Sequence, residues 1–208
     1  MPDAKRIALY GGTFDPVHLG HLEVARKVSE LFEIEKVMFI PAQIAPHKVG
    51  RPVTEPLHRY AMLALATQDD ARLLISTFEL DAPDRRYTVD TVAEFQRSLG
   101  QETELFFIMG ADSWSEINTW REWERLLKMT NHIVVTRPGF PVAPAPPGLS
   151  ERIFFTDAVL KDISATNIRR LASEGRHDEL EQLVPQSVAD YIRKYGIYRD
   201  SNEAKLNS

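Results

Sequence analysis

The chain reads IALYGGTFDPVHLGH over residues 7–21, and this stretch carries its clearest structural signal. Residues 7–10 form a short apolar run that is typical of a buried strand, and two glycines end it. Over residues 19–32 the apolar side chains recur at helical spacing. A strand that passes through a glycine turn into a helix is the first half of a βαβ unit.

The same alternation of strands and helices continues along the chain. Strands are predicted over residues 36–40, 72–78, 104–109, 133–136 and 152–156. Helices are predicted over 88–99, 111–128 with a break near Thr119, 164–173 and 187–194. Another helix is expected after a capping Thr54, with Leu57, Ala61 and Leu65 as its buried stripe.

This pattern predicts an α/β fold with a doubly wound, Rossmann-like parallel sheet and helices on both faces. A length of 208 residues suits a single domain, which we expect over residues 1–200, followed by a polar tail at 201–208. Ligands of such sheets bind at the carboxyl ends of the strands, where the strand order switches. Candidate chemistry is therefore sought just after each predicted strand.

Composition excludes several classes of function. The chain has no cysteine, which rules out disulfides, thiolate metal sites and a cysteine nucleophile. Its net charge of −5 argues against a nucleic-acid partner. No apolar run reaches the roughly 18 residues that suggest a membrane span. We therefore expect a cytoplasmic protein without a membrane partner, and the sequence does not indicate its oligomeric state.

The loop after the first strand has the features of an anion site. Gly11 and Gly12 are expected to permit a tight turn with positive φ and a close backbone approach. The next helix starts near His18, so its free N–H groups and positive end face the loop. His18 and His21, with Gly20 between them, could donate hydrogen bonds to phosphate oxygens. The alternative is one exposed capping histidine and one packed histidine.

Neighbouring residues of this loop have less specific readings. Asp15 is expected to hold the turn through an Asx-type bond. A zinc site at the two histidines is disfavoured, because no H-E-x-x-H pattern and no cysteine accompany them.

A second anion site is predicted near the other end of the chain. Ser164 suits the N-cap of a helix, and Thr166 adds a hydroxyl close to the helix N-terminus. Arg169 could close on this site as a bidentate phosphate clamp. The alternative is an ordinary capped helix with an exposed arginine.

These two segments resemble motifs of a known superfamily. GGTFDPVHLGH at residues 11–21 resembles the first motif of the nucleotidyltransferases that carry T/H-x-G-H, and ISATNIR at 163–169 resembles their I-S-S-T-x-I-R motif. PHK at 46–48, YTVDT at 87–91, and GADS at 110–113 through Trp120 are similar to motifs of the bacterial nicotinate-nucleotide adenylyltransferases. The resemblance spans residues 7 to about 198.

The resemblance implies an enzyme that transfers the adenylyl group of ATP to nicotinate mononucleotide. The products would be deamido-NAD and pyrophosphate, and Mg²⁺ would arrive bound to ATP. The attacking phosphate oxygen is already anionic at neutral pH, so the reaction needs no general base. Catalysis would consist of positioning two anions and stabilising charge in the transition state.

The resemblance also implies roles for individual residues. His18, His21, Lys48 and Arg169 would stabilise the transition state and the departing pyrophosphate. The residues expected to bind ATP and its phosphates are Gly11, Gly12, Thr13, Phe14, Gly20, Gly110, Asp112, Ile163, Ser164 and Thr166.

For the second substrate, backbone amides at Tyr87 and Thr88 would receive the nicotinate carboxylate, and Trp120 would stack on the pyridine ring. Arg85 and Arg86 depart from the small residue that many relatives carry before this pair. They could attract the carboxylate or be exposed.

Other functions stay open at this point. Sister adenylyltransferases accept nicotinamide mononucleotide or phosphopantetheine, and a cytidylyltransferase would use CTP. A non-catalytic nucleotide sensor would keep the glycines and Arg169 but could lose the histidines, which this chain retains. No G-x-G-x-x-G follows the first strand and no Gly-Lys pair occurs, which disfavours a dehydrogenase or a P-loop kinase.

Overall fold

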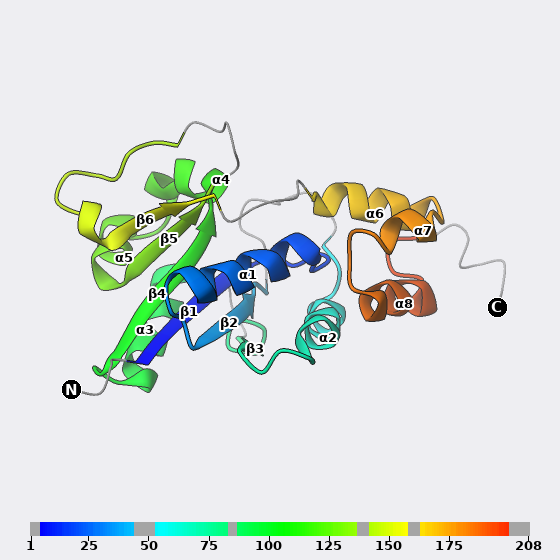
Figure 1. Ribbon diagram of the computed structural model, residues 1–208, viewed down its shortest axis with the longest axis horizontal. Helices are drawn as coiled ribbons and strands as arrows, with labels where there is room; N and C mark the ends of the chain where they lie inside the picture. The colour runs from blue at the N-terminus through cyan, green and yellow to red at the C-terminus, as the bar shows by residue number, and fades with distance from the viewer. Residues whose placement is uncertain (1–4, 44–52, 83–86, 137–141, 158–162, 200–208) are drawn as a thin grey trace.

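The fold is built on one parallel sheet. The computed structural model describes residues 5–43, 53–82, 87–136, 142–157 and 163–199. Within them, six parallel strands lie in the order β3-β2-β1-β4-β5-β6 (Figure 1). The strands are β1 (Lys5–Gly12), β2 (Lys36–Pro41), β3 (Leu73–Ile75), β4 (Thr103–Gly110), β5 (Asn131–Val135) and β6 (Ile153–Thr156). The predicted doubly wound parallel α/β fold is confirmed.

The strand order switches direction between β1 and β4. The chain winds outward from β1 to β3 and then returns to lay β4 on the other side of β1. Tyr10 pairs with Phe39 of β2 and with Ile108 of β4, so β1 lies between the two halves of the sheet. This switch point is where ligands of such sheets bind.

Helices cover both faces of the sheet. The main helices are α1 (Leu19–Leu31), α2 (Pro56–Thr67), α3 (Thr88–Leu99), α4 (Ala111–Ser115), α5 (Trp123–Met129), α6 (Ala165–Ser173), α7 (His177–Leu180) and α8 (Gln186–Tyr195). Two 3₁₀ turns, η1 (Ile117–Thr119) and η2 (Ser150–Arg152), complete the elements of the described ranges. None of these helices has the length and apolar character that a membrane crossing requires.

Alternation along the strands divides the core into two clusters. Ala8 of β1 and Phe106 of β4 face the cluster that contains Val24 and Val28 of α1. Leu9 and Phe107, one residue further along each strand, face the opposite cluster, with Val92 of α3 and Leu127 of α5. Successive apolar residues of each strand therefore point to opposite faces of the sheet.

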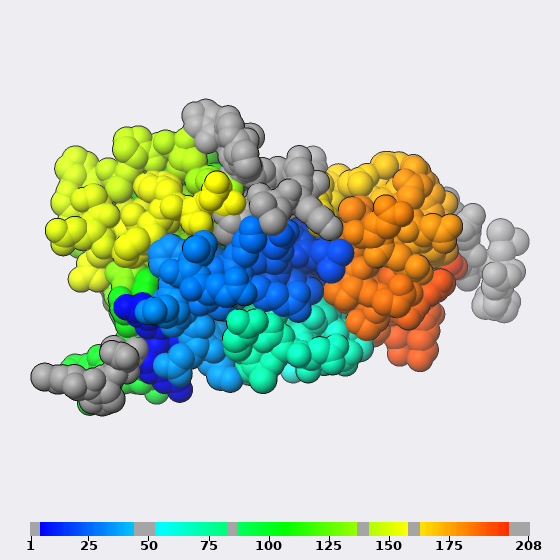
Figure 2. Space-filling model, viewed as in Figure 1, coloured from blue at the N-terminus to red at the C-terminus, as the bar shows by residue number. Residues whose placement is uncertain are grey.

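The last three helices join the first cluster. Leu180, Val188 and Ile192 are buried in the same cluster as the inner face of α1. The backbone N–H of Leu19 at the start of α1 donates to the carbonyl of Leu183, at 2.9 Å. Figure 1 shows α6, α7 and α8 gathered beside α2 at one end of the molecule, and Figure 2 shows this orange segment packed against the blue one. The C-terminal helices are therefore part of the same domain.

The helix after Thr54 differs from the prediction. It begins at Pro56, and its buried residues include Arg59, Met62 and Leu63. Leu57, expected in the buried stripe, is 75% exposed. The N-cap is Glu55 instead of the predicted Thr54. The prediction was wrong at Leu57 because the buried face of this helix includes Arg59, which is completely buried and donates to backbone carbonyls.

Two other expectations differ only in extent. The third strand covers Leu73–Ile75 instead of residues 72–78. The helical segment predicted over 111–128 is divided into α4, η1 and α5, so the expected break near Thr119 is confirmed.

A buried histidine makes stability depend on pH. His132 of β5 is fully buried, and burial lowers its pKa to about 4. The unfolded chain, with a histidine pKa near 6.5, binds the proton more readily between these values, so stability falls as pH falls from about 6.5 to 4. A shift of this size is worth about 3 kcal/mol at pH 4.

We expect that in His132→Gln the free energy of unfolding, measured with urea, loses most of this pH dependence. If the free energy of unfolding changes with pH equally in the variant and in the natural chain, this prediction is wrong.

Candidate active site

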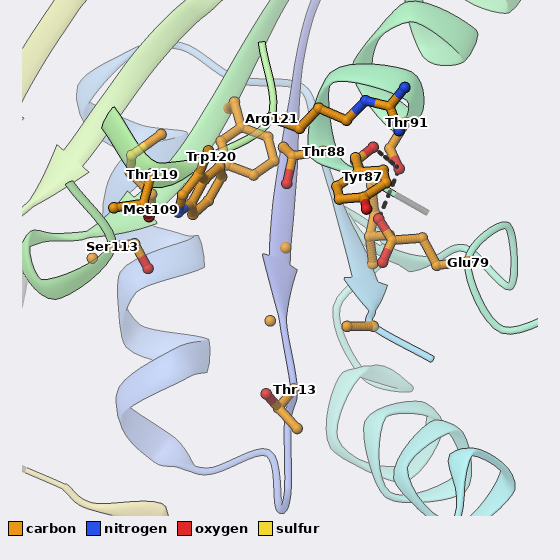
Figure 3. A pocket seen from close by; sticks show the side chains of 16 residues that line it. Thr13, Glu79, Tyr87, Thr88, Thr91, Met109, Ser113, Thr119, Trp120 and Arg121 are labelled. Carbon is orange, nitrogen blue, oxygen red and sulfur yellow. Dashed lines mark hydrogen bonds between the residues drawn. The ribbon is translucent and has the colours of Figure 1, made fainter. Parts of the chain in front are cut away.

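A cavity of about 250 Å³ opens at the carboxyl ends of β1, β2 and β4, at the switch point of the sheet (Figure 3). It brings together residues from the loop after β1, the start of α3 and the segment after β4. Seven sequence-predicted site residues line it: Gly11, Gly12, Thr13, Tyr87, Thr88, Gly110 and Trp120. The cavity lies at the strand ends, where the sequence analysis predicted the site.

Gly11 and Gly12 are needed for close packing. A Cβ on Gly12 would lie 2.8 Å from Cζ of Phe14, and one on Gly11 would lie 3.2 Å from Cζ of Phe107. The expected positive φ is found at Phe14 instead, at 49°. This conformation folds the buried Phe14 ring back over the strand end, where it packs edge-on against His21 with ring centroids 5.0 Å apart.

The two histidines form a stacked pair at the N-terminus of α1. His18 is the N-cap residue, and His21 lies three residues later in the first turn. Their ring centroids are 3.7 Å apart, with 25° between the planes. The backbone N–H of His18 donates to Nδ1 of His21 at 3.3 Å. In the neutral His21 ring this bond places the ring proton on Nε2.

The tip of α6 meets the tip of α1. Nη1 of Arg169 donates to the carbonyl of Asp15 at 2.7 Å, and Nη2 donates to Oγ1 of Thr166 at 3.1 Å. A Cβ on Gly20 would lie 3.7 Å from Cβ of Ile163 and 3.1 Å from Nδ1 of His18. Ser164, at the N-cap of α6, is exposed. The structure therefore brings the two predicted anion sites together.

Arg59 ties three segments around the site, and the sequence analysis did not identify it. Nε donates to the carbonyl of Thr54 at 2.9 Å, Nη1 to that of Thr13 at 2.8 Å, and Nη2 to that of Gln43 at 3.3 Å. Burial lowers the pKa of Arg59, and the charge of Asp15 opposes that shift. Thr13 lines the cavity and Arg59 does not, so Arg59 holds the loop after β1 from outside the cavity.

Asp15 makes long-range bonds instead of the expected Asx-type bond. Its carboxylate accepts the hydroxyl of Tyr198 at 2.8 Å and the backbone N–H of Thr54 at 3.3 Å. Burial raises the pKa of Tyr198, and the charge of Asp15 adds to that shift, so the phenol stays protonated and donates. Tyr198 follows Asp15 by 183 residues. No local sequence signal could pair them.

Aromatic side chains line the other end of the cavity. Figure 3 shows Trp120 and Tyr87 on either side of Thr88, with Thr13 at the far end of the view. Trp120 packs edge-on against Phe107, with centroids 6.4 Å apart. Tyr87 is the N-cap of α3, and its carbonyl accepts the N–H of Asp90 at 2.9 Å. The first N–H groups of this helix, including that of Thr88, have no acceptor within the helix, and Thr88 lines the cavity.

The unpredicted lining residues include Glu79, Thr91 and Arg121. Glu79 and Thr91 line the same end, where Oγ1 of Thr91 donates to Oε1 of Glu79 at 2.7 Å. Arg121 places Cζ 4.7 Å from the centroid of the Tyr87 ring. Arg121 directly follows Trp120 in the sequence, and this adjacency is the only signal that could have identified it.

Some predicted residues lie elsewhere. Asp112 is exposed in the first turn of α4 and does not line the cavity. The lining also lacks the predicted residues at the tips of α1 and α6, which are Phe14, His18, Gly20, His21, Ile163, Ser164, Thr166 and Arg169. Lys48 lies outside the described residues, and so do Arg85 and Arg86.

Comparison with known proteins agrees with these features. The sequence model of the cytidylyltransferase-like family matches residues 9–171. A probable nicotinate-nucleotide adenylyltransferase of Thermoanaerobacter sp. (strain X514) is 41% identical over 210 residues, covering 98% of this chain and 99% of the relative. One from Thermus thermophilus is 44% identical over 194 residues, covering 93% and 100%.

Solved structures show the same fold. The nicotinic acid mononucleotide adenylyltransferase of Plasmodium falciparum complexed with NaAD aligns with a TM-score of 0.77 at 22% identity. The alignment covers 93% of this chain and 97% of the other. The same protein complexed with APC aligns with a TM-score of 0.76.

The bond between Tyr198 and Asp15 is expected to stabilise the fold. Tyr198→Phe removes the hydroxyl that the buried carboxylate of Asp15 accepts, which should lower the free energy of unfolding by about 1–3 kcal/mol. Urea denaturation measures this loss. The control is Tyr195→Phe, because that side chain is 53% exposed and its substitution should cost less than about 0.5 kcal/mol. Equal losses in the two variants would refute a specific role for the bond.

Proposed function

The chain belongs to the nicotinate-nucleotide adenylyltransferases of the cytidylyltransferase-like family, and from this premise we propose how its site carries out the reaction. The reaction joins ATP and nicotinate mononucleotide to give deamido-NAD and pyrophosphate. The strongest support is one continuous cavity at the switch point, which runs from the aromatic pair Tyr87 and Trp120 to the loop at Thr13. That cavity suits a nucleotide with an aromatic ring at one end and a phosphate at the other.

The reaction is a displacement at phosphorus. A phosphate oxygen of nicotinate mononucleotide bonds to the α-phosphorus of ATP, and the bond from that phosphorus to the bridging oxygen of pyrophosphate breaks. The attacking oxygen is anionic at neutral pH, so no proton has to be removed first. The difficulty is to hold two anions in line, and good orientation contributes roughly 7–11 kcal/mol to such reactions.

His18, His21 and Arg169 supply the donors for this chemistry. The His18 backbone bond to Nδ1 of His21 orients the His21 ring and keeps the proton on Nε2, from which it donates to a phosphoryl oxygen. Arg169 is held by Asp15 and Thr166 beside the same helix tip, where its remaining N–H groups reach the pyrophosphate. Lys48, in the segment after β2, adds a further cation to the triphosphate.

The remaining phosphate contacts come from backbone and hydroxyl groups. Gly11, Gly12, Thr13 and Phe14 present the loop after β1, and Gly20 lets a ligand approach the histidine pair. The other members of the proposed ATP-binding set are Gly110, Asp112, Ile163, Ser164 and Thr166.

The nicotinate ring occupies the aromatic end of the cavity. Trp120 stacks on the pyridine ring, and the N-terminal amides of α3 at Tyr87 and Thr88 receive its carboxylate. The backbone N–H groups and the positive end of a helix favour an anionic substituent at this place.

We further propose that Mg²⁺ enters bound to the triphosphate. Imidazole, guanidinium and N–H donors at the phosphate end suit phosphate oxygens, and no group of three His, Asp or Glu ligands occurs among the residues that the structure describes. These donors are compatible with a magnesium–ATP complex whose ion is held by phosphate and water. The bound ion would supply charge neutralisation of the departing pyrophosphate.

Substrate identity is tested by pyrophosphate release from ATP with nicotinate mononucleotide, nicotinamide mononucleotide and phosphopantetheine in turn, and by exchanging ATP for CTP. We expect the fastest release with ATP and the acid mononucleotide, because the start of α3 favours a carboxylate. Faster release with the amide, with phosphopantetheine or with CTP would refute this substrate assignment.

The role of His18 is tested by His18→Ala. Loss of one donor that acts in the transition state should lower kcat by at least about 100-fold. Thermal unfolding checks that the variant folds. His177→Ala is the control, because His177 lies in α7 and is not one of the proposed phosphate-binding residues. Unchanged turnover in folded His18→Ala would remove this residue from the mechanism.

A further inference from the structure

We propose that the side chain of Arg121 selects the negatively charged nicotinate ring over the neutral nicotinamide ring. This inference rests on the proposed function and names a specificity-determining residue for it. The charge of the guanidinium would act on the ring substituent at the aromatic end of the cavity, far from the reacting phosphorus.

Arg121 lies at the aromatic end of the cavity. The residue lines the cavity next to Trp120, and its Cζ lies 4.7 Å from the centroid of the Tyr87 ring. Figure 3 shows the side chain reaching from the Trp120 segment over Tyr87, toward the start of α3. The contact with the ring holds the guanidinium beside the helix N-terminus that is proposed to receive the carboxylate.

The carboxylate next to Arg121 pairs more closely with another arginine. Its Nε lies 3.7 Å from Oε1 of Glu122, but Oε2 of that same carboxylate accepts Nη1 of Arg125 at 2.8 Å. The Arg125 bond is the largest cause of the lowered pKa of Glu122, and Arg121 contributes less. One carboxylate thus faces two guanidinium groups outside the cavity.

Glu79 supplies the opposite charge in the same cavity. It and Arg121 are the charged residues among the described residues that line it. Oε1 of Glu79 accepts the hydroxyl of Thr91 at 2.7 Å, which fixes this carboxylate against α3. An anionic ring substituent is therefore attracted by Arg121 and repelled by Glu79.

Charge is the property that separates the two substrates. A carboxylate and a carboxamide have nearly the same size, and both present an oxygen that accepts a backbone N–H. Backbone amides therefore bond to either group, whereas a full positive charge favours the carboxylate. The Arg121 side chain is 56% exposed, so solvent screens it, and we expect it to contribute about a fivefold to tenfold preference.

The effect should be on KM. The ring substituent takes no part in the displacement, so its attraction to Arg121 is the same in the ground state and the transition state. Loss of such uniform binding raises KM and leaves kcat unchanged.

The experiment compares Arg121→Gln, Glu79→Gln and Arg125→Gln with the natural chain. Pyrophosphate release gives kcat/KM for the acid and amide mononucleotides at low and high salt. Where the amide is not turned over, its inhibition constant against the acid replaces its kcat/KM. Arg125→Gln is the matched control, since it removes an equal charge that contacts Glu122 but does not line the cavity.

We expect Arg121→Gln to lower the acid-to-amide ratio about fivefold to tenfold through the KM of the acid, with less change at high salt. Glu79→Gln should raise the ratio, and Arg125→Gln should leave it within about twofold. The proposal is overturned if the acid-to-amide ratio of Arg121→Gln stays within about twofold of that of the natural chain. It is also overturned if Arg125→Gln lowers this ratio as much as Arg121→Gln does, or if Glu79→Gln lowers the ratio.

The experiment distinguishes failure of the proposed function from failure of the proposed role of Arg121. A natural chain that releases no pyrophosphate with the acid mononucleotide refutes the proposed function. A natural chain with normal turnover and an unmoved ratio in Arg121→Gln refutes only the role of Arg121.

Discussion

The buried guanidinium of Arg59 is the constraint on which the site depends. It donates to the carbonyls of Thr13, Gln43 and Thr54, which belong to three separate segments of the chain. A buried charge is tolerated only when its donors are satisfied and an opposite charge lies near, and Asp15 supplies that charge. The loop after β1, the segment after β2 and the start of α2 therefore have to be in place together.

From Asp15 the same network reaches the far end of the chain. Its carboxylate accepts the Tyr198 hydroxyl, and its carbonyl accepts Arg169. These two bonds attach the segment after α8 and the first turns of α6 to the loop that precedes α1. The tips of α1 and α6 consequently meet, although they lie far apart in the sequence. The proposed phosphate site therefore depends on these long-range hydrogen bonds as well as on its two local motifs.

Local sequence signals were enough for the sheet, most of the helices and the glycine turn at Gly11 and Gly12. The expectations for Gly110, Tyr87, Thr88 and Trp120 came from the family resemblance. The local signals succeeded because strands and helices have fixed periods, and because a glycine turn followed by a helix is a short-range pattern. They failed at Arg59, because an arginine within a helix is normally assigned to solvent. They also failed at Asp15, whose partner Tyr198 is distant in sequence. The Cβ clash between Gly12 and Phe14 likewise appears only once the ring folds back.

The aromatic end of the cavity and the neighbouring histidine pair are supported by different parts of the core. Phe14, beside His21, and Ile168 of α6 are packed in the cluster on the α1 face of the sheet. Trp120 and Tyr87 pack against the opposite cluster, beneath α3 and α5. The sheet separates these clusters, so the aromatic pair and the histidine pair are packed against different parts of the core. Such a division lets the choice of ring substituent change while the chemistry at phosphorus is retained.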